Sequence, residues 1–371
     1  MSHAHPDDTA DHPTSNRQGL KRAPTITRRG SAPEPAVAEP SEASAPEPAR
    51  APQPETEWAV VEPTEKDMGL VRLTLDKGVK TTAIGQVYGL DFEIEGDDFN
   101  VRVFFDNYNR RLKVIDYSAT NYRALCERLI WLANANEFDK IFIKADRNDW
   151  QEFLCLGFVL EGILKYYDRG EDAFVMSRFS SLERALSQRV IAETDLIETL
   201  MRQDRSEAHP TLADGLECFA CKEQHIPELV ALYRHVFRTY PNPLTHPDYI
   251  QQTMRRNMLY RAVCDQTGHI ISAASAEMDT KHSNAELTDC ATSPECRGGG
   301  LMNHLLSRLG DDLIERDIQT GYSLARARSH GMNRVFYSLG YEYSGRLINN
   351  CDINGQFEDM NIWVKLLESH E

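Results

Sequence analysis

The sequence predicts an α/β (α+β) protein in which a mixed central sheet is flanked by helices, and it predicts this arrangement twice in one chain of 371 residues. Three observations lead to this fold class. Strand patterns alternate with helix patterns from about residue 66 onward, a glycine-rich turn joins a strand to a helix after residue 297, and two distant segments repeat one another. The first 65 residues show none of these patterns.

Residues 1–65 are rich in Pro, Ala, Glu and Ser, as in the run SAPEPAVAEPSEASAPEPARAPQPE. A segment with so few large apolar side chains cannot bury enough surface to order itself, so we expect a disordered tail. The N-terminus has no hydrophobic core of a signal peptide, and no apolar run approaches the ~20 residues that cross a bilayer. We therefore expect a cytoplasmic protein with no membrane partner.

The charge balance bears on the kind of partner. A formal net charge of -16 and a pI near 5.3 argue against nucleic acid, whose phosphates an acidic surface repels. A small cationic partner suits this balance, although the same charge could serve solubility alone.

Cysteine spacing raises the question of a metal. Cys218 and Cys221 are separated by two residues, and His225 follows them. In a strand these two thiols point to opposite faces, and no second ligand pair stands at a suitable spacing. We therefore expect buried thiols and no metal, and the eight scattered cysteines suit reduced thiols without disulfides.

Residues 66–180 are predicted to fold in the order ββαβαββ. The runs FNVRVFF and RLKVIDY alternate apolar with polar residues, and a turn-prone DNYN stands between them. A helix, a strand over 141–145, a short helix through Trp150 and Phe153 and two strands ending in AFVMSRF follow. The apolar stripe of the long helix consists of Tyr122, Leu125, Leu129, Ile130 and Leu132.

Residues 181–214 are predicted to form a helical linker, with a helix from about Leu182 to Met201. From 215 to 371 the predicted order is βαββ and then βαβαβ, with a further short strand near Tyr341. The elements are, in order, LECFA, a helix up to Phe237, YRAVCD, HIISAASAEM, AELTDCAT, the helix LMNHLLSRLGDDLIE, GYSLARA, the helix MNRVFYSLG and MNIWVKL.

An internal repeat connects these two regions. FLCLGFVLEGIL, starting at Phe153, matches FYSLGYEYSGRL, starting at Phe336, with Phe, Leu, Gly, Gly and Leu in register. Region 66–180 is therefore predicted to be a degenerate copy of region 215–371. It has no glycine-rich turn before its long helix, so only the second copy should bind a cofactor.

The run TDCATSPECRGGGL, from Thr288 to Leu301, is predicted to be a strand, a tight turn and the start of a helix. Glycines 298–300 allow a diphosphate to approach backbone N–H groups, and the helix N-terminus adds partial positive charge beside Arg297. An ordinary loop is the alternative interpretation, and the place of the run at the fourth strand of a βαββαβαβ order favours the phosphate cradle.

At this junction the sequence resembles the GNAT acyltransferases, whose motif Gln/Arg-x-x-Gly-x-Gly/Ala binds the CoA diphosphate. Arg297, Gly298 and Gly300 match it, whereas Glu295 stands at its first position. The resemblance implies the GNAT fold, acetyl-CoA as co-substrate and a bulged strand whose open edge pairs with the pantetheine. The implied cofactor contacts are Cys290, Ala291, Thr292, Arg297, Gly298, Gly299, Gly300, Leu301, Asn333 and Phe336.

Four longer runs are similar to the β-lysine N-acetyltransferase family, and this similarity extends over region 66–180. They are YPNPLTHPDYIQQTM, AELTDCATSPECRGGGLMNHLL, ARSHGMNRVFYSLGY and LINNCDINGQFEDMNIW. The resemblance implies acetylation of the side-chain amine of β-lysine to make a compatible solute for osmotic stress. The alternatives are another small amine such as lysine or a polyamine, a protein lysine, or a non-catalytic acyl-CoA sensor.

The chemistry requires a base, because an amine with a pKa of roughly 10.4 must lose a proton before it attacks a thioester. Asp289 is the first candidate and Glu286 the second, with a purely structural carboxylate as the alternative. Backbone N–H groups near Cys290 and Ala291 would serve the oxyanion. The family's acid, a tyrosine, would stand at Phe336, so its neighbour Tyr337 is the candidate here. Cys290 as an acyl-accepting nucleophile is a weaker alternative.

For the acceptor, Glu358 and Asp359 are predicted to hold the amine that is not acetylated, and Arg326 the carboxylate. Tyr240 and Asn350 are further substrate candidates from the family-like runs. Each of these residues has an ordinary loop or cap role as its alternative. The sequence does not predict an oligomeric state, and a dimer is compatible with it.

Overall fold

The structure is a computed structural model that describes residues 70–84, 89–205 and 211–367, so the tail predicted over 1–65 lies outside the described residues. The strands are β1 Leu70–Asp76, β2 Val79–Ile84, β3 Gly89–Glu95, β4 Phe99–Asp106, β5 Arg111–Ala119, β6 Lys140–Ala145, β7 Val159–Asp168, β8 Glu171–Phe179, β9 Glu217–Ala220, β10 Met258–Cys264, β11 Ile270–Asp279, β12 Asn284–Thr292, β13 Thr320–Arg326, β14 Glu342–Ile353 and β15 Gln356–Leu366. The α-helices are α1 Tyr122–Ala135, α2 Trp150–Cys155, α3 Leu182–Ala185, α4 Val190–Met201, α5 Ile226–Val236, α6 Pro247–Arg256, α7 Leu301–Ile314 and α8 His330–Ser338. Two 3₁₀ turns cover Glu223–His225 and Pro294–Cys296.

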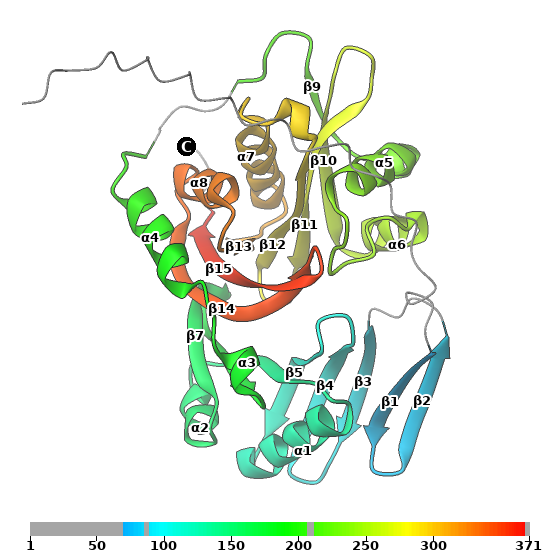
Figure 1. The fold of residues 1–371 in the computed structure, drawn as a ribbon, viewed down its shortest axis with the longest axis vertical. Coiled ribbons are helices and arrows are strands. Elements are labelled where there is room, and N and C mark those ends of the chain that lie inside the picture. The colour runs from blue at the N-terminus through cyan, green and yellow to red at the C-terminus, as the bar shows by residue number, and fades with distance from the viewer. Residues whose placement is uncertain (1–69, 85–88, 206–210, 368–371) are drawn as a thin grey trace, which may run out of the picture. The chain divides into compact units, whose positions relative to one another are not determined.

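The described strands after β2 form one mixed sheet in the order β3-β4-β5-β6-β8-β7-β14-β15-β13-β12-β11-β10-β9, while β1 and β2 pair only with each other (Figure 1). The first half of this sheet, β3 to β8, and the second half, β9 to β15, repeat one order. In that order β5 corresponds to β12, β6 to β13, β7 to β14 and β8 to β15. The predicted mixed sheet flanked by helices is confirmed.

Several elements differ from the prediction. Strands β1, β2 and β3 precede the predicted ββαβαββ set, α6 fills the proline-rich run after Tyr240, and β14 is a 12-residue strand where a short one was predicted. The helix predicted from Leu182 to Met201 is divided into α3 and α4, because Leu186 takes an extended conformation at the end of α3. Within the described residues no helix is long and apolar enough to cross a membrane.

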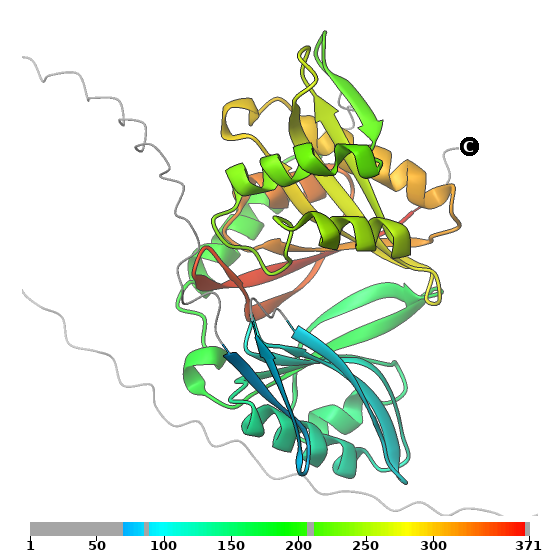
Figure 2. The ribbon, with the colours of Figure 1, turned by 90° about the vertical axis from the view of Figure 1, so that its right-hand side faces the viewer.

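Helices cover the faces of the sheet unequally. Helix α1 packs on β4, β5 and β6 in the first half, and α7 and α8 pack on one face of the second half. Helices α5 and α6 lie side by side and cover β10 to β12 on the opposite face (Figure 2). Apolar side chains of β6, β7 and β8 in the first half and of β13, β14 and β15 in the second half share one core. The buried members include Phe142, Leu164 and Val175 from the first half and Tyr322, Leu347 and Ile362 from the second.

The internal repeat is explained where the halves join. The pairing of β7 with β14 is Gly162 opposite Gly345, and these two residues are the second glycines of the two repeated segments. A Cβ on Gly345, whose φ is +148°, would lie 2.4 Å from the carbonyl oxygen of Glu161. Both copies therefore keep glycine at this position, because the two backbones approach too closely for a side chain.

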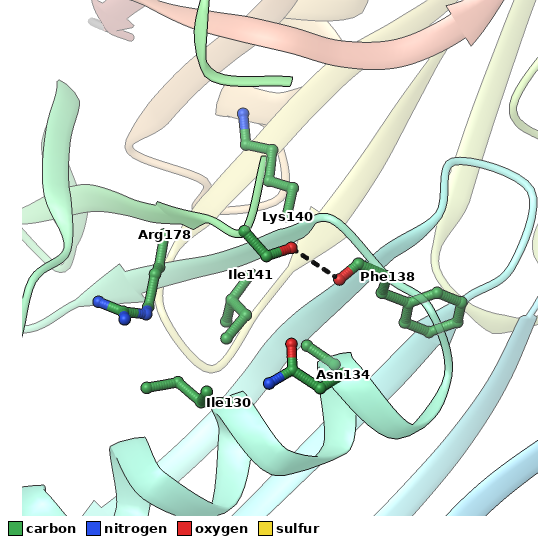
Figure 3. A pocket seen from close by; sticks show the side chains of 8 residues that line it. Ile130, Asn134, Phe138, Lys140, Ile141 and Arg178 are labelled. Atoms are coloured by element: carbon green, nitrogen blue, oxygen red, sulfur yellow. Dashed lines mark hydrogen bonds between the residues drawn. The ribbon is translucent and has the colours of Figure 1, made fainter. Parts of the chain in front are cut away.

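Buried polar contacts also join the halves. The ammonium of Lys140, a fully buried residue, donates to the carbonyl of Ile348 in β14 at 2.9 Å and pairs with Glu161 at 2.9 Å. Figure 3 shows Lys140 pointing away from α1 and from the hollow of about 20 Å³ beside Ile130, Phe138 and Ile141. Such a hollow holds about one water molecule, so it offers no room for a substrate.

Candidate active site

The catalytic candidate Asp289 lies in a β-bulge of β12. Ser275 on β11 pairs with Thr288 and Ala273 pairs with Ala291, so Asp289 and Cys290 together stand opposite Ala274. Asp289 has a φ of +51°, which is a left-handed conformation. A bulge of this kind bends its strand and turns a side chain toward a new direction.

Beyond the bulge, β12 parts from its parallel neighbour. The two strands pair over 284–286 and 320–322, whereas β13 continues its pairing with β15 up to Arg326. Within the described residues, the edge of β12 from residue 287 to 292 has no strand beside it on that side. An extended chain can pair with such an edge, as the predicted contacts at Cys290, Ala291 and Thr292 require.

The glycine-rich loop leaves the N-terminus of α7 accessible. Gly298 and Gly300 have φ of +87° and +74°, and Gly300 is the N-cap residue, without a side-chain hydrogen bond to the helix. A Cβ on Gly298 would meet nothing within 4 Å. Arg297 donates to the carbonyl of Thr292 at 3.2 Å, which ties the loop to the open strand. The first-turn N–H groups and the open space beside them fit a diphosphate.

Two further motif positions frame this loop. Glu295 is exposed and accepts a hydrogen bond from Ser293 at 2.7 Å, which lowers its pKa. Leu301, the first residue of α7, is buried in the core beneath the loop. Gly299 lies between the two left-handed glycines, and a Cβ there would come no closer than 3.9 Å to a neighbouring atom.

Asp289 is buried and accepts two hydrogen bonds. Ser275 donates to it at 2.8 Å and Asn242, from the loop before α6, donates at 3.2 Å. Burial raises the pKa of Asp289 to about 6, and the charges of Glu277 and Glu286 act in the same direction against these hydrogen bonds. A carboxylate with this pKa is ionised near neutral pH and can still accept a proton.

Tyr240, a predicted substrate residue, lies close to Asp289. Burial raises the pKa of its phenol, and the charge of Asp289 adds to the shift. The phenols of Tyr233, Tyr249 and Tyr260 have a raised pKa from burial and from the same carboxylate. Asp289 therefore lies among aromatic rings on the α5 and α6 side of the sheet.

Glu286, the second base candidate, lies directly opposite Glu277 of β11. It is partly exposed and accepts a hydrogen bond from the Tyr322 hydroxyl at 3.2 Å. Burial raises the pKa of Glu286, and Lys144 and Lys113 of the first half lower it. Because like charges opposite one another on neighbouring strands are unfavourable, this pair of acids favours a cation between or beside them.

Tyr337, the candidate acid for the leaving thiolate, already has hydrogen-bond partners within the chain. Its hydroxyl donates to the carbonyls of Gln203 and Met201, at 2.8 and 3.3 Å, beyond the end of α4. Phe336 is fully buried, and its ring packs on that of Tyr341 with centroids 5.2 Å apart. Burial and the charge of Asp289 raise the pKa of the Cys290 thiol, which keeps it protonated.

Asn333 corrects the expectation of a contact with CoA. It is fully buried, and its amide nitrogen donates to the carbonyls of Arg326, Ala327 and Ser329. Its amide oxygen accepts from Asn361 and Trp363, both at 2.9 Å. Since every polar atom of this side chain is engaged, Asn333 fixes the turn from β13 to α8 against β15.

Glu358 and Asp359 do not lie together, because successive residues of a strand point to opposite faces. Glu358 is held by Arg328 through two contacts, at 2.9 and 3.1 Å. Asp359 accepts from the backbone N–H of Asn349 and approaches Glu193 of α4 on the other face. The prediction that both acids hold one amine is therefore wrong.

Arg326 lines a cavity of about 370 Å³ together with Arg328, Ser329 and Glu358. Within the described residues its guanidinium has no hydrogen bond or ion pair. Asn350, the last predicted substrate residue, is fully buried, and its carbonyl accepts from Arg111 of the first half at 3.0 Å. Its side-chain oxygen is buried without a hydrogen bond to the described residues.

The contact of Glu193 with Asp359 predicts a dependence of stability on pH. Burial and the neighbouring Asp359 raise the pKa of Glu193 to about 7, although Arg346 at 3.6 Å lowers it. Because the folded state holds this proton more tightly than the unfolded chain, the stabilisation is complete below about pH 4.5 and is lost as pH rises to about 7. We expect a loss on the order of 1 to 3 kcal/mol between these limits.

Thermal unfolding at acidic and mildly alkaline pH checks this expectation. Glu193→Gln should flatten the decline of the melting temperature, because its amide carries no charge at any of these pH values. Glu198→Gln on the exposed side of the same helix, where the acid pairs with Arg202, is the matched control. An equally steep decline in Glu193→Gln would contradict the assignment.

Several residues at this site carry no local signal in the sequence. Asn242 and Ser275 are ordinary polar residues until the fold brings them to Asp289. Glu277 could have been noted from its alternation with Ser275 on one strand, whereas Lys113 and Lys144 belong to the other copy. Cys218 and Cys221 are free thiols, and within the described residues no three His, Cys, Asp or Glu side chains gather as metal ligands.

Comparison with known proteins identifies the family. Residues 229–341 match the model of the acetyltransferase (GNAT) family. The N-acetyltransferase YodP of Bacillus subtilis is 38% identical over 266 residues, which cover 71% of this chain and 94% of the relative. The Beta-lysine N(6)-acetyltransferase of Methanosarcina mazei is 35% identical over 256 residues, which cover 64% of this chain and 94% of the relative.

Among solved structures, the ribosomal-protein-S5-alanine acetyltransferase of Vibrio fischeri superposes on 43% of this chain and 96% of its own. The sequences are 14% identical and the TM-score is 0.38. The sequence relatives and the family model carry the assignment, and enzymes of this family use acetyl-CoA. The chain belongs to the GNAT acetyltransferase family.

Proposed function

We propose that the chain transfers the acetyl group of acetyl-CoA to the side-chain amine, N6, of β-lysine and thereby makes a compatible solute. The observation that carries the proposal is Asp289, a buried carboxylate with a raised pKa at the bulge beside the open edge of β12. Two relatives named for this reaction, at 35% and 33% identity, support the choice of acceptor.

The residues of the second half supply the steps. Asp289 accepts a proton from the acceptor ammonium, and the nitrogen then attacks the thioester carbonyl carbon. The carbon–sulfur bond breaks, the amide remains on the acceptor and CoA leaves as the thiol after taking up a proton. Backbone N–H groups after the bulge, at Cys290 and Ala291, are our candidates for stabilising the oxyanion.

Residues of the glycine-rich loop would hold the diphosphate of CoA. Its backbone from Arg297 to Gly300 and the open N-terminus of α7 supply the donors. The corresponding helix α1 of the first half is closed, because the Asn121 side chain accepts from the N–H of Ala124 at 3.1 Å. We therefore keep the proposal that residues 215–371 are the catalytic domain and residues 66–180 a degenerate copy that binds no CoA.

The opposed acids Glu277 and Glu286 are our candidates for the amine that stays unmodified, in place of Glu358 and Asp359. Glu286 stands three residues before Asp289 on β12, roughly 10 Å along a strand, which is close to the length of an extended diamino acid. A second cationic amine held there would present the far end of the molecule to Asp289.

Release of the CoA thiol from acetyl-CoA tests the proposal, with β-lysine, α-lysine, ornithine and spermidine supplied separately. We expect the highest kcat/KM with β-lysine and a product acetylated at N6. Turnover of spermidine or of a protein lysine in preference to β-lysine would replace the proposed acceptor. A reaction without any amine is the control, and it measures hydrolysis of the thioester by water.

A further inference from the structure

The two halves place opposite charges at equivalent positions. In the second half, parallel pairing of β12 with β13 ends at Glu286 opposite Tyr322. In the first half, parallel pairing of β5 with β6 ends at Lys113 opposite Phe142. Lys113 is thus the counterpart of Glu286, at the point where each strand parts from its neighbour.

These two positions face one another across the junction of the halves. Leu112 and Val114 point into the core under α1, so the intervening Lys113 points to the other face of β5. Lys144, on the same face of β6, donates to the hydroxyl of Tyr322 at 3.0 Å, and that hydroxyl donates to Glu286. The first half is therefore linked to Glu286 through the hydroxyl of Tyr322.

The charges of Lys113 and Glu286 act on one another. Burial and the charge of Arg111 lower the pKa of Lys113, and the carboxylates of Asp106 and Glu286 act in the opposite direction. Burial raises the pKa of Glu286, and Lys144 and Lys113 act against that rise. Among the described residues no ion pair within 4.0 Å joins Lys113 to Glu286.

Of the cations at this place, Lys113 is available for a ligand. Arg111 is engaged with Asp106 at 2.7 Å and with the Asn350 carbonyl, and Lys144 with the hydroxyls of Tyr167 and Tyr322. Lys113 is a half-buried residue, and its ammonium lies 5.8 Å from the ring centroid of Phe104. Within the described residues it makes no hydrogen bond or ion pair.

We propose that Lys113 of the degenerate half binds the carboxylate of the acceptor, so that the enzyme acts on a diamino acid and not on a simple polyamine. This inference rests on the proposed function. Along the site the order of groups is Asp289, then the acids Glu277 and Glu286, then Lys113. A diamino acid has the same order: the amine to be acetylated, the second amine, and a carboxylate one or two bonds from the carbon that carries this second amine.

The sequence alone predicted Arg326 for this carboxylate, and the structure separates the two candidates. Arg326 lies beyond the point where β12 and β13 part, beside Arg328 and the Glu358 that Arg328 already holds. Lys113 instead adjoins the acids that remain available for the second amine. A carboxylate bound to Lys113 therefore keeps the neighbouring amine near Glu286.

Lys113→Met in the full-length protein, assayed on two matched pairs of acceptors, tests the inference. The pairs are β-lysine with 1,4-diaminopentane and α-lysine with 1,5-diaminopentane, which differ only by the carboxylate. Loss of a charge-assisted contact should raise KM for the amino acids about 10- to 100-fold, and leave kcat/KM for the diamines and KM for acetyl-CoA unchanged. Lys113→Arg should recover most of the loss, because it restores a cation.

Arg326→Met and Lys165→Met are assayed in parallel, the second as an exposed lysine whose partner is Glu342. A selective loss for the amino acids in Arg326→Met but not in Lys113→Met overturns the inference, as does an equal loss on amino acids and diamines. A wild-type enzyme that prefers the diamines overturns it too. If neither amino acid is acetylated, the proposed function itself fails, whereas an unchanged KM for β-lysine in Lys113→Met defeats only the role of Lys113.

Discussion

Replacing Asp289 by asparagine is expected to lower kcat/KM for the acceptor by about 100- to 10,000-fold, the range that removal of a general base covers. The carboxylate is buried, is held by Ser275 and Asn242, and lies at the bulge that opens the edge of β12. Asparagine keeps the shape and can accept one of these hydrogen bonds, but it cannot take up the proton of the ammonium. Steady-state assay of CoA release measures the loss.

The pH dependence of the wild-type enzyme tests the same assignment. Since the pKa of Asp289 is raised to about 6, protonation below that value removes the base, and kcat/KM should fall on the acid side of about pH 6. Asp289→Asn should lack this acid limb, and its residual rate should rise with pH as more of the amine becomes neutral.

Two variants separate a catalytic carboxylate from a structural one. Ser275→Ala removes a hydrogen bond that lowers the pKa of Asp289, so its acid limb should move above pH 6 while the variant stays active. Asp265→Asn is the matched control for Asp289→Asn. It makes the same replacement of an aspartate by asparagine, but in the turn between β10 and β11, and it should leave the pH profile unaltered. An unshifted limb in Ser275→Ala would assign that pKa to another group.

The parts of the site that are contiguous in the sequence could be predicted from it. The strand, the glycine loop and the helix start between Thr288 and Leu301 form one local unit, and both Asp289 and the glycines lie where the pattern placed them. The repeated segments likewise predicted two copies of one fold. Their second glycines, Gly162 and Gly345, pair with each other where the two backbones are in contact. Local chemistry suffices where neighbours in the chain are neighbours in space.

Other assignments failed because they depend on the direction of a side chain or on a distant partner. Glu358 and Asp359 are adjacent in the sequence, but their side chains point to opposite faces of the strand. The polar side chain of Asn333, at the start of a helix, suggested a contact with a ligand. Its five hydrogen bonds are instead made within the chain, and they become visible only once the turn from β13 to α8 is known. Lys113 is 173 positions from Glu286 in the chain (286 less 113), so no local pattern links them.

Replacing Gly345 by alanine is expected to lower the free energy of unfolding by about 3 to 5 kcal/mol, as the sum of overpacking and an unfavourable backbone conformation. The new Cβ would lie 2.4 Å from both the Glu161 carbonyl oxygen and the Gly162 Cα, and neither is the flexible end of a side chain. Gly162→Ala should cost less, because its closest neighbour is the movable Cδ1 of Ile362 at 2.6 Å and its nearest backbone atom, the carbonyl oxygen of Ser344, is farther away at 2.9 Å.

Gly170→Ala is the matched control, since that residue has a φ of +98° and nothing within 4 Å of the added Cβ. It should cost about 1 to 2 kcal/mol, the expense of the left-handed conformation alone. Equal losses in Gly345→Ala and Gly170→Ala, measured by denaturant unfolding, would refute a close crossing of β7 and β14. This crossing joins the half that carries Lys113 to the half that carries Asp289. The folded fraction of Gly345→Ala should therefore show a raised KM for β-lysine and a smaller change, or none, in KM for acetyl-CoA.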